Sequence, residues 1–166
     1  MGNISTSEKN LGDRLASILD KAKFVHHEAK DFVASTAIAE NVFLEFLKYS
    51  NAKLAKHLQD SETETKKFFA FLSDEILKKG TAECLRRGIS YNGSSTTLYF
   101  TSPDPSLPKT DEEYNHNIFG YAREVYYQQN GANRIDFVIF LNGFPLVTIE
   151  LKNNLTDTKV DRKSVV

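Results

Sequence analysis

The segment Arg134–Lys152 constrains the fold of this chain more than any other part of the sequence. Its charged residues lie only near its two ends, and Asn142-Gly143 separates two runs of β-branched and aromatic residues. An Asn-Gly pair flanked in this way is the strongest short-range signal for a β-hairpin. We therefore predict two antiparallel strands, with Asp136 on the first strand and Glu150 and Lys152 together on one face of the second.

The register of this hairpin decides whether those charged residues can meet. A two-residue turn would pair Leu141 with Phe144 and place Asp136 opposite Ile149, on the face away from Glu150. A three-residue loop would pair Leu141 with Pro145 and place Asp136 opposite Glu150. The longer loop also leaves one face without charge, made of Ile135, Phe137, Ile139, Leu141, Pro145, Val147, Ile149 and Leu151. Because a one-residue slip would bring charges into that apolar face, we predict the three-residue loop.

In the predicted register, Asp136, Glu150 and Lys152 are the residue types that metal-dependent cleavage of a phosphodiester requires. Two carboxylates can hold a divalent cation, and the Leu151 carbonyl is the expected third ligand. Lys152 would orient the attacking water or neutralise the charge that develops on the phosphate. Any one of these residues alone is more often part of a solvated strand end, but the three together at this spacing favour a nuclease.

Asp136 and Glu150-Leu151-Lys152 resemble the PD-(D/E)xK nuclease signature, with Ile135-Asp136 in place of Pro-Asp. The neighbouring residues are more specific: Asn133–Asp136, the turn sequence Leu141–Val147 and the strand end Ile149–Asn153. Together they resemble the nuclease block of the restriction (R) subunit of type I restriction enzymes. The resemblance runs from about Asn117 to Asn153. It is loose over Ser61–Gly88, and residues 1–60 show no match.

This resemblance implies a type I site-specific deoxyribonuclease that cuts double-stranded DNA with Mg²⁺, or with Mn²⁺ in its place. It also implies partners, namely the modification and specificity subunits of the restriction complex. ATP would act only through motor domains, since this chain has no G-x-x-x-x-G-K-[ST] loop. Many nucleases of this fold add a glutamate from an early helix, for which Glu28, Glu40 and Glu45 are candidates. The alternative is a catalytically inert nuclease-fold module used for subunit assembly.

The end of the chain departs from the pattern of this family. Related enzymes usually continue with a helix that carries a Gln-x-x-x-Tyr element, whereas residues 153–166 contain neither Gln nor Tyr. We therefore expect an N-terminal fragment or a truncated product. We expect one nuclease-like domain over residues 1–166, with a mainly helical part (1–88), a sheet that holds the catalytic hairpin (89–152) and a truncated tail (153–166).

Composition sets limits on compartment and partners. A chain of 166 residues is long enough for one domain with a substantial core. Its formal net charge of −1 leaves little basic surplus, so we expect a motor or partner subunit to hold the DNA. The single cysteine, Cys84, agrees with a reducing cytoplasm. No signal peptide is visible, and no apolar stretch approaches the ~20 residues of a membrane span.

Hydrophobic spacing predicts helices in the first half of the chain and strands in the second. Helical stripes cover Leu11–Leu19, Val42–Leu58 and Phe68–Ile76, the last opened by a Ser61 capping box and stopped by Gly80, with a short piece at Ala82–Arg87. Strands are predicted at Thr96–Thr101, at Asn117–Gln128 and in the hairpin, with an exposed loop at Ser102–His116. The expected fold class is mixed α/β and restriction-endonuclease-like: N-terminal helices packed on a small mixed, mostly antiparallel sheet.

Overall fold

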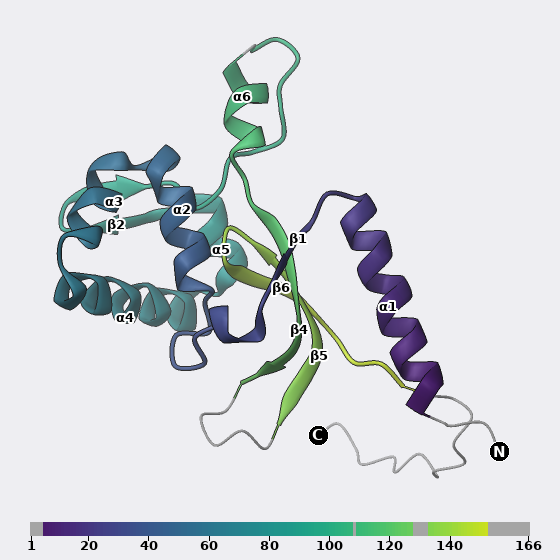
Figure 1. Cartoon of the computed structure of the whole chain (residues 1–166). Helices are drawn as coiled ribbons and strands as arrows, with labels where there is room; N and C mark the ends of the chain where they lie inside the picture. Colours follow the sequence, from purple (N-terminus) through teal and green to yellow (C-terminus); the bar gives the residue numbers. More distant parts are fainter. Residues whose placement is uncertain (1–4, 108, 128–132, 153–166) are drawn as a thin grey trace.

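The computed structural model describes residues 5–107, 109–127 and 133–152, with side chains from Glu8 onward (Figure 1). The helices are α1 (Ser5–Lys21), the 3₁₀ turn η1 (Ala29–Asp31), α2 (Glu40–Ser50), α3 (Ala52–Gln59), α4 (Glu62–Lys79), α5 (Thr81–Arg87) and α6 (Lys109–Asn115). The strands are β1 (Val25–His27), β2 (Ile89–Tyr91), β3 (Ser94–Thr96), β4 (Phe119–Tyr126), β5 (Arg134–Leu141) and β6 (Phe144–Ile149).

A four-stranded sheet with the strand order β1-β4-β5-β6 forms the centre of the fold. β1 runs parallel to β4, whereas β4, β5 and β6 pair antiparallel. The prediction of a small mixed, mostly antiparallel sheet is therefore confirmed. β1 was not predicted, because its three residues are too few to show a period and its partner strand lies far along the chain.

Helices cover both faces of this sheet (Figure 1). On one face, Leu19 of α1 packs against Tyr121 of β4 and Phe137 of β5. On the other face, Val42 of α2 packs in a cluster with Val138 and other buried residues of β4 and β5. The middle strands are therefore buried on both sides, which explains why β5 is an almost continuous apolar run.

The helical half of the molecule has an aromatic core of its own. Fully buried rings come from α2 and α4 and from the turn end of the hairpin: Phe43, Phe46, Phe68, Phe69 and Phe144. The centroid of the Phe43 ring lies 4.9 Å from that of Phe144 and 6.2 Å from that of Phe68. The closed end of the hairpin is thus built into the helical core.

Helix α4 begins and ends where the sequence predicts. The Ser61 hydroxyl accepts a hydrogen bond from the Glu64 N–H at 3.3 Å, and Gly80 ends the helix with a φ of 84°. The stripe predicted across Val42–Leu58 is divided into α2 and α3. It breaks because Asn51 is non-helical, with a φ of −156° and a ψ of 75°, and its side chain caps α3 by accepting from the Leu54 N–H at 3.1 Å.

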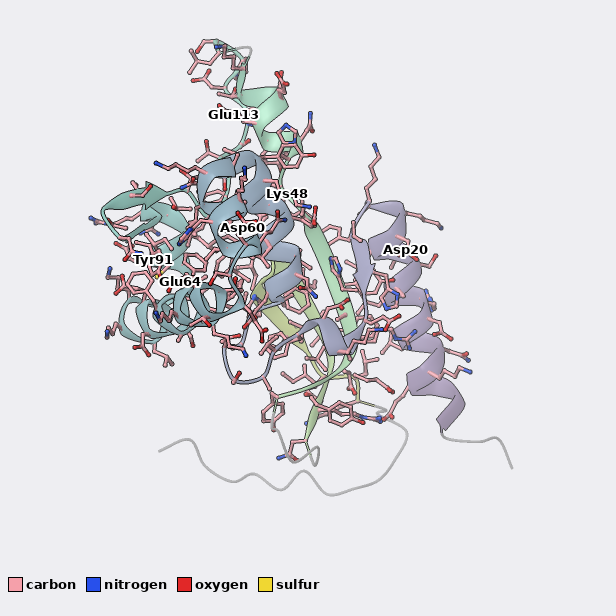
Figure 2. All side chains as sticks on the ribbon, turned by 60° about the vertical axis from the view of Figure 1, so that its left-hand side comes forward. Asp20, Lys48, Asp60, Glu64, Tyr91 and Glu113 are labelled. Carbon is pink, nitrogen blue, oxygen red and sulfur yellow. The ribbon has the colours of Figure 1, made fainter. Side chains whose placement is uncertain are left out.

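Two predictions for the segment before β4 are wrong. A strand was predicted at Thr96–Thr101, but the observed strand β3 covers Ser94–Thr96 and pairs with β2 in a short hairpin. The exposed loop predicted at Ser102–His116 contains α6, whose first turn carries Asp111 and Glu112, a favourable placement for negative charge. Figure 2 shows α6, with Glu113 labelled, projecting from the body of the molecule. The strand predicted at Asn117–Gln128 is β4, and Gln128 and residues 153–166 lie outside the described residues.

Candidate active site

The turn between β5 and β6 has two residues, so the predicted three-residue loop is wrong. Leu141 pairs with Phe144, and Asn142 and Gly143 have φ values of 52° and 86°, as a type I′ turn requires. The core selects this shorter turn. The buried Asn142 side chain accepts from the Ile118 N–H at 2.7 Å and donates to the Leu98 carbonyl at 3.0 Å, while Phe144 enters the aromatic core.

A β-bulge farther along the hairpin restores the register that the longer loop was predicted to give. Phe140 pairs with Pro145, but Ile139 pairs with Val147, so Leu146 is the extra residue on β6. The ladder then continues to Phe137 opposite Ile149. The next positions on the two strands are Asp136 and Glu150.

The faces of the hairpin differ from the prediction at the sheet edge. Phe137, Ile149 and Leu151 pack on the α1 side, as the apolar face requires. Val147, predicted on the same face, is 47% exposed because β6 is an edge strand. Burial thus follows the position of each strand in the sheet as well as the alternation of its residues.

Asp136 is bound to the strand that carries Glu150 and Lys152. One of its carboxylate oxygens, Oδ2, accepts a hydrogen bond from the Leu151 N–H at 2.7 Å. Asp136 is half-buried, whereas Glu150 and Lys152 are exposed. The hydrogen bond fixes the Asp136 carboxylate beside the backbone of the Glu-x-Lys segment.

A cavity of about 410 Å³ opens at this end of the sheet. Its walls come from α1, from the ends of β4 and β5 and from the residue after the hairpin: Glu8, Lys9, Arg123, Glu124, Arg134, Asp136, Phe137 and Leu151. Glu150 and Lys152 are not part of this lining. Asp136 and Leu151, the middle residue of the Glu-x-Lys segment, therefore both border the cavity.

Ion pairs order two of the cationic side chains of the cavity, Arg123 and Arg134. Arg123 Nη1 donates to Asp13 Oδ1 at 2.9 Å, and the Arg123 guanidinium lies 5.3 Å from the centroid of the Phe137 ring. Arg134 lies 3.4 Å from Glu124. Glu124 has a φ of 54°, which is uncommon for a residue with a side chain, and it sits between two paired positions of β4, at the point that faces Asp136.

A family model for the type I restriction enzyme R protein N terminus matches residues 5–163 of the chain. The chain belongs to this family. Comparison with curated proteins and with solved structures found no match. The match includes α1 and β1, so the relationship to the R protein N terminus extends well beyond the hairpin block on which the sequence resemblance rested.

The donor atoms in this R protein N terminus suit a hard divalent cation. Among the residues that the structure describes, no group of three or more His, Cys, Asp or Glu side chains is arranged to hold a metal. Magnesium, however, is commonly held by one or two carboxylates and completes its shell with water and substrate phosphate. Asp136 and Glu150, with the Leu151 carbonyl, fit such a site in the number and chemistry of their oxygens.

The glutamates considered for an early-helix acid lie outside the Asp136 cavity. Glu28 lines a separate surface hollow with His26 and His27. Glu40 accepts a hydrogen bond from the Thr36 hydroxyl at 2.8 Å, and burial raises the pKa of its carboxyl. The early-helix acid that does line the cavity is Glu8 of α1. It carries no motif, and only the packing of α1 on the sheet brings it there.

In the part of the chain that the structure describes, no helix has the length and apolar character needed to cross a membrane.

Proposed function

We propose that this R protein N terminus is a Mg²⁺-dependent endonuclease domain that hydrolyses phosphodiesters of double-stranded DNA. The observation that carries the proposal is the bulged register of the hairpin: its ladder reaches Phe137 opposite Ile149, and Asp136 and Glu150 are the next residues on the two strands. Membership of the R-protein family supports the same reaction class. The proposed catalytic residues are Asp136, Glu150 and Lys152.

Asp136, Glu150 and the Leu151 carbonyl would hold the metal ion. When bound, the ion would polarise the phosphodiester and lower the pKa of a bound water. Asp136 is prepared for this role because the Leu151 N–H already orients its carboxylate at 2.7 Å. Mn²⁺ accepts the same oxygen ligands and would replace Mg²⁺.

Lys152 would place an ammonium group against the reacting phosphate. It follows Glu150 by two residues at the strand end, so both side chains leave the same side of the chain when it is extended. The ammonium group has three donors and no acceptor, so it can orient an attacking water or stabilise the charge of the pentavalent phosphate.

The proposed substrate and partners follow from the family. The substrate is double-stranded DNA within a type I restriction complex, and the modification and specificity subunits would select the site. The formal net charge of −1 supports a division of labour in which other parts of the complex supply most of the DNA affinity. ATP would be hydrolysed by motor domains, with no part in the chemistry at Asp136.

Calorimetric titration of the purified chain with Mn²⁺, followed by incubation with plasmid DNA and Mg²⁺ at low salt, tests the proposal. We expect metal binding in the parental chain, its loss in Glu150→Gln, and weak plasmid cleavage that EDTA stops. Glu113→Gln on the distant helix α6 is the matched control and should bind metal like the parent. Parental and Glu150→Gln chains that both fail to bind metal would instead support an inert module used for subunit assembly.

A further inference from the structure

Arg123 is held by two contacts at the wall of the Asp136 cavity. Its Nη1 donates to Asp13 of α1, and its guanidinium lies over the Phe137 ring at 5.3 Å from the centroid. The guanidinium also lies near the backbone of α1 at Gly12. A Cβ atom added to Gly12 would lie 2.9 Å from Arg123 Nη2. Gly12 therefore leaves room for the guanidinium, and a side chain there would make the end of Arg123 shift.

The restrained guanidinium still reaches solvent. The Arg123 side chain is 35% exposed, and it lines both the Asp136 cavity and the neighbouring hollow beneath His26 and Glu28. A guanidinium group has five N–H donors in a planar fork, and the bond to Asp13 uses one nitrogen. The remaining donors match the geometry of a phosphate group.

Arg123 also supplies a positive charge at a fixed position, in a chain whose formal net charge is −1. Its restraint by Asp13 and Phe137 removes much of the rotamer freedom that an arginine normally loses on binding. Because Arg123 and Asp136 line the same cavity, a DNA strand with one phosphodiester at Asp136 has Arg123 on the adjoining wall.

We propose that Arg123 is a positioning residue that binds a DNA phosphate neighbouring the one cleaved at Asp136, with Gly12 and Asp13 setting the orientation of its guanidinium. This inference rests on the proposed endonuclease function. It adds a substrate contact from β4 and α1 to a site otherwise built from the hairpin.

The test measures binding of a short double-stranded oligonucleotide to the purified chain, in EDTA so that no cleavage occurs, over a series of salt concentrations. Loss of one phosphate contact should reduce the slope of log K against log salt by about 0.9. We expect that reduction in Arg123→Gln. Arg14→Gln, an exposed arginine of α1, removes the same charge and should keep the parental slope.

Further variants separate phosphate binding from support of the fold. Asp13→Asn removes the ion pair that orients the guanidinium but keeps the arginine, so it should lower the slope less than Arg123→Gln does. Gly12→Ala keeps the charge but displaces Arg123, so it should lower the slope even though alanine favours a helix. Thermal unfolding of each variant shows whether the fold is kept. Arg123→Lys provides a milder change if Arg123→Gln does not fold.

The results overturn the proposal if Arg123→Gln and Arg14→Gln have equal slopes, or if the parental chain does not bind the duplex at low salt. Titration with Mn²⁺ distinguishes failure of this proposal from failure of the proposed endonuclease function. Asp136→Asn should lose Mn²⁺ binding and keep the slope, whereas Arg123→Gln should lose slope and keep Mn²⁺ binding.

Discussion

The two ends of the β5–β6 hairpin lie in opposite environments. At the closed end, Asn142 and Phe144 are completely buried, and the Asn142 side chain is hydrogen-bonded on both its oxygen and its nitrogen. At the open end, Asp136 is half-buried and Glu150 and Lys152 are exposed. The closed end therefore anchors the two strands, and the open end presents charged groups on strands that are fixed at their other end.

Different helices pack on the two ends of the hairpin. The closed end enters the core of α2 and α4, where rings from both helices contact one another. The open end lies beneath α1, which packs through Leu19 and its neighbours and through two polar contacts, Asp20 with Tyr121 and Asp13 with Arg123. Figure 2 shows Asp20 on α1, apart from the helical half. Stability is expected to be concentrated at the closed end and chemistry at the open end.

The largest expected effect concerns the open end. Within a complete R subunit, Asp136→Ala, Glu150→Ala or Lys152→Ala should abolish DNA cleavage and spare ATP hydrolysis, because the role proposed for these residues is at the phosphodiester and this chain has no G-x-x-x-x-G-K-[ST] loop. Plasmid cleavage and phosphate release are the two measurements. Cleavage by Lys152→Ala at the parental rate would remove that residue from the site.

Phe144→Ala addresses the closed end. We expect a loss of about 3–5 kcal/mol in the free energy of unfolding, because the substitution empties a fully buried ring position against Phe43. Leu146→Ala, at the bulge and 48% exposed, is the control and should change stability little. Urea denaturation measures both. Similar losses in the two variants would show that the closed end is not the anchor.

Tyr121→Phe weakens the attachment of α1 to strand β4. The Tyr121 hydroxyl donates to Asp20 at 2.9 Å, and burial, followed by this hydrogen bond, raises the pKa of the phenol. We expect a loss of about 0.5–1.5 kcal/mol, because Asp20 is exposed and water can replace the lost donor. A loss as large as that of Phe144→Ala would mean that the attachment of α1 contributes as much to stability as the closed end.

The smallest effect concerns pH and strand β1. The His27 Nε2 is buried without a hydrogen-bond partner among the described residues, and burial lowers the pKa of its imidazole below the ordinary 6.5. The unfolded chain therefore binds a proton more readily, so this contribution to stability is present above the ordinary pKa and is lost as pH falls through the folded value. Between pH 7 and 5, about the range in which histidine titrates, stability should fall less in His27→Gln than in the parent.

His26→Gln, at the exposed neighbouring position, is the control for this pH series and should follow the parent. Equal pH dependence of His27→Gln and the parent would exclude His27 as a source of the effect.

Local sequence was sufficient for the elements whose signals are short-range. The Ser61 cap, the Gly80 end of α4 and the Asn-Gly hairpin were all predicted and are all present, because a cap or a tight turn depends on a few neighbouring residues. The mixed α/β class followed from the change of hydrophobic period along the chain. The roles of Asp136, Glu150 and Lys152 remain a prediction.

Only the tertiary structure decided how those residues meet. The sequence predicted Asp136 opposite Glu150, but with a three-residue turn instead of the two-residue turn of the structure. The local sequence does not reveal that Phe144 packs in the core of α2 and α4. That packing imposes the two-residue turn, and the bulge at Leu146 then restores the register. Glu8 and Arg123 line the Asp136 cavity for a similar reason: packing of α1 on the sheet brings together residues that are distant in the chain and carry no shared motif.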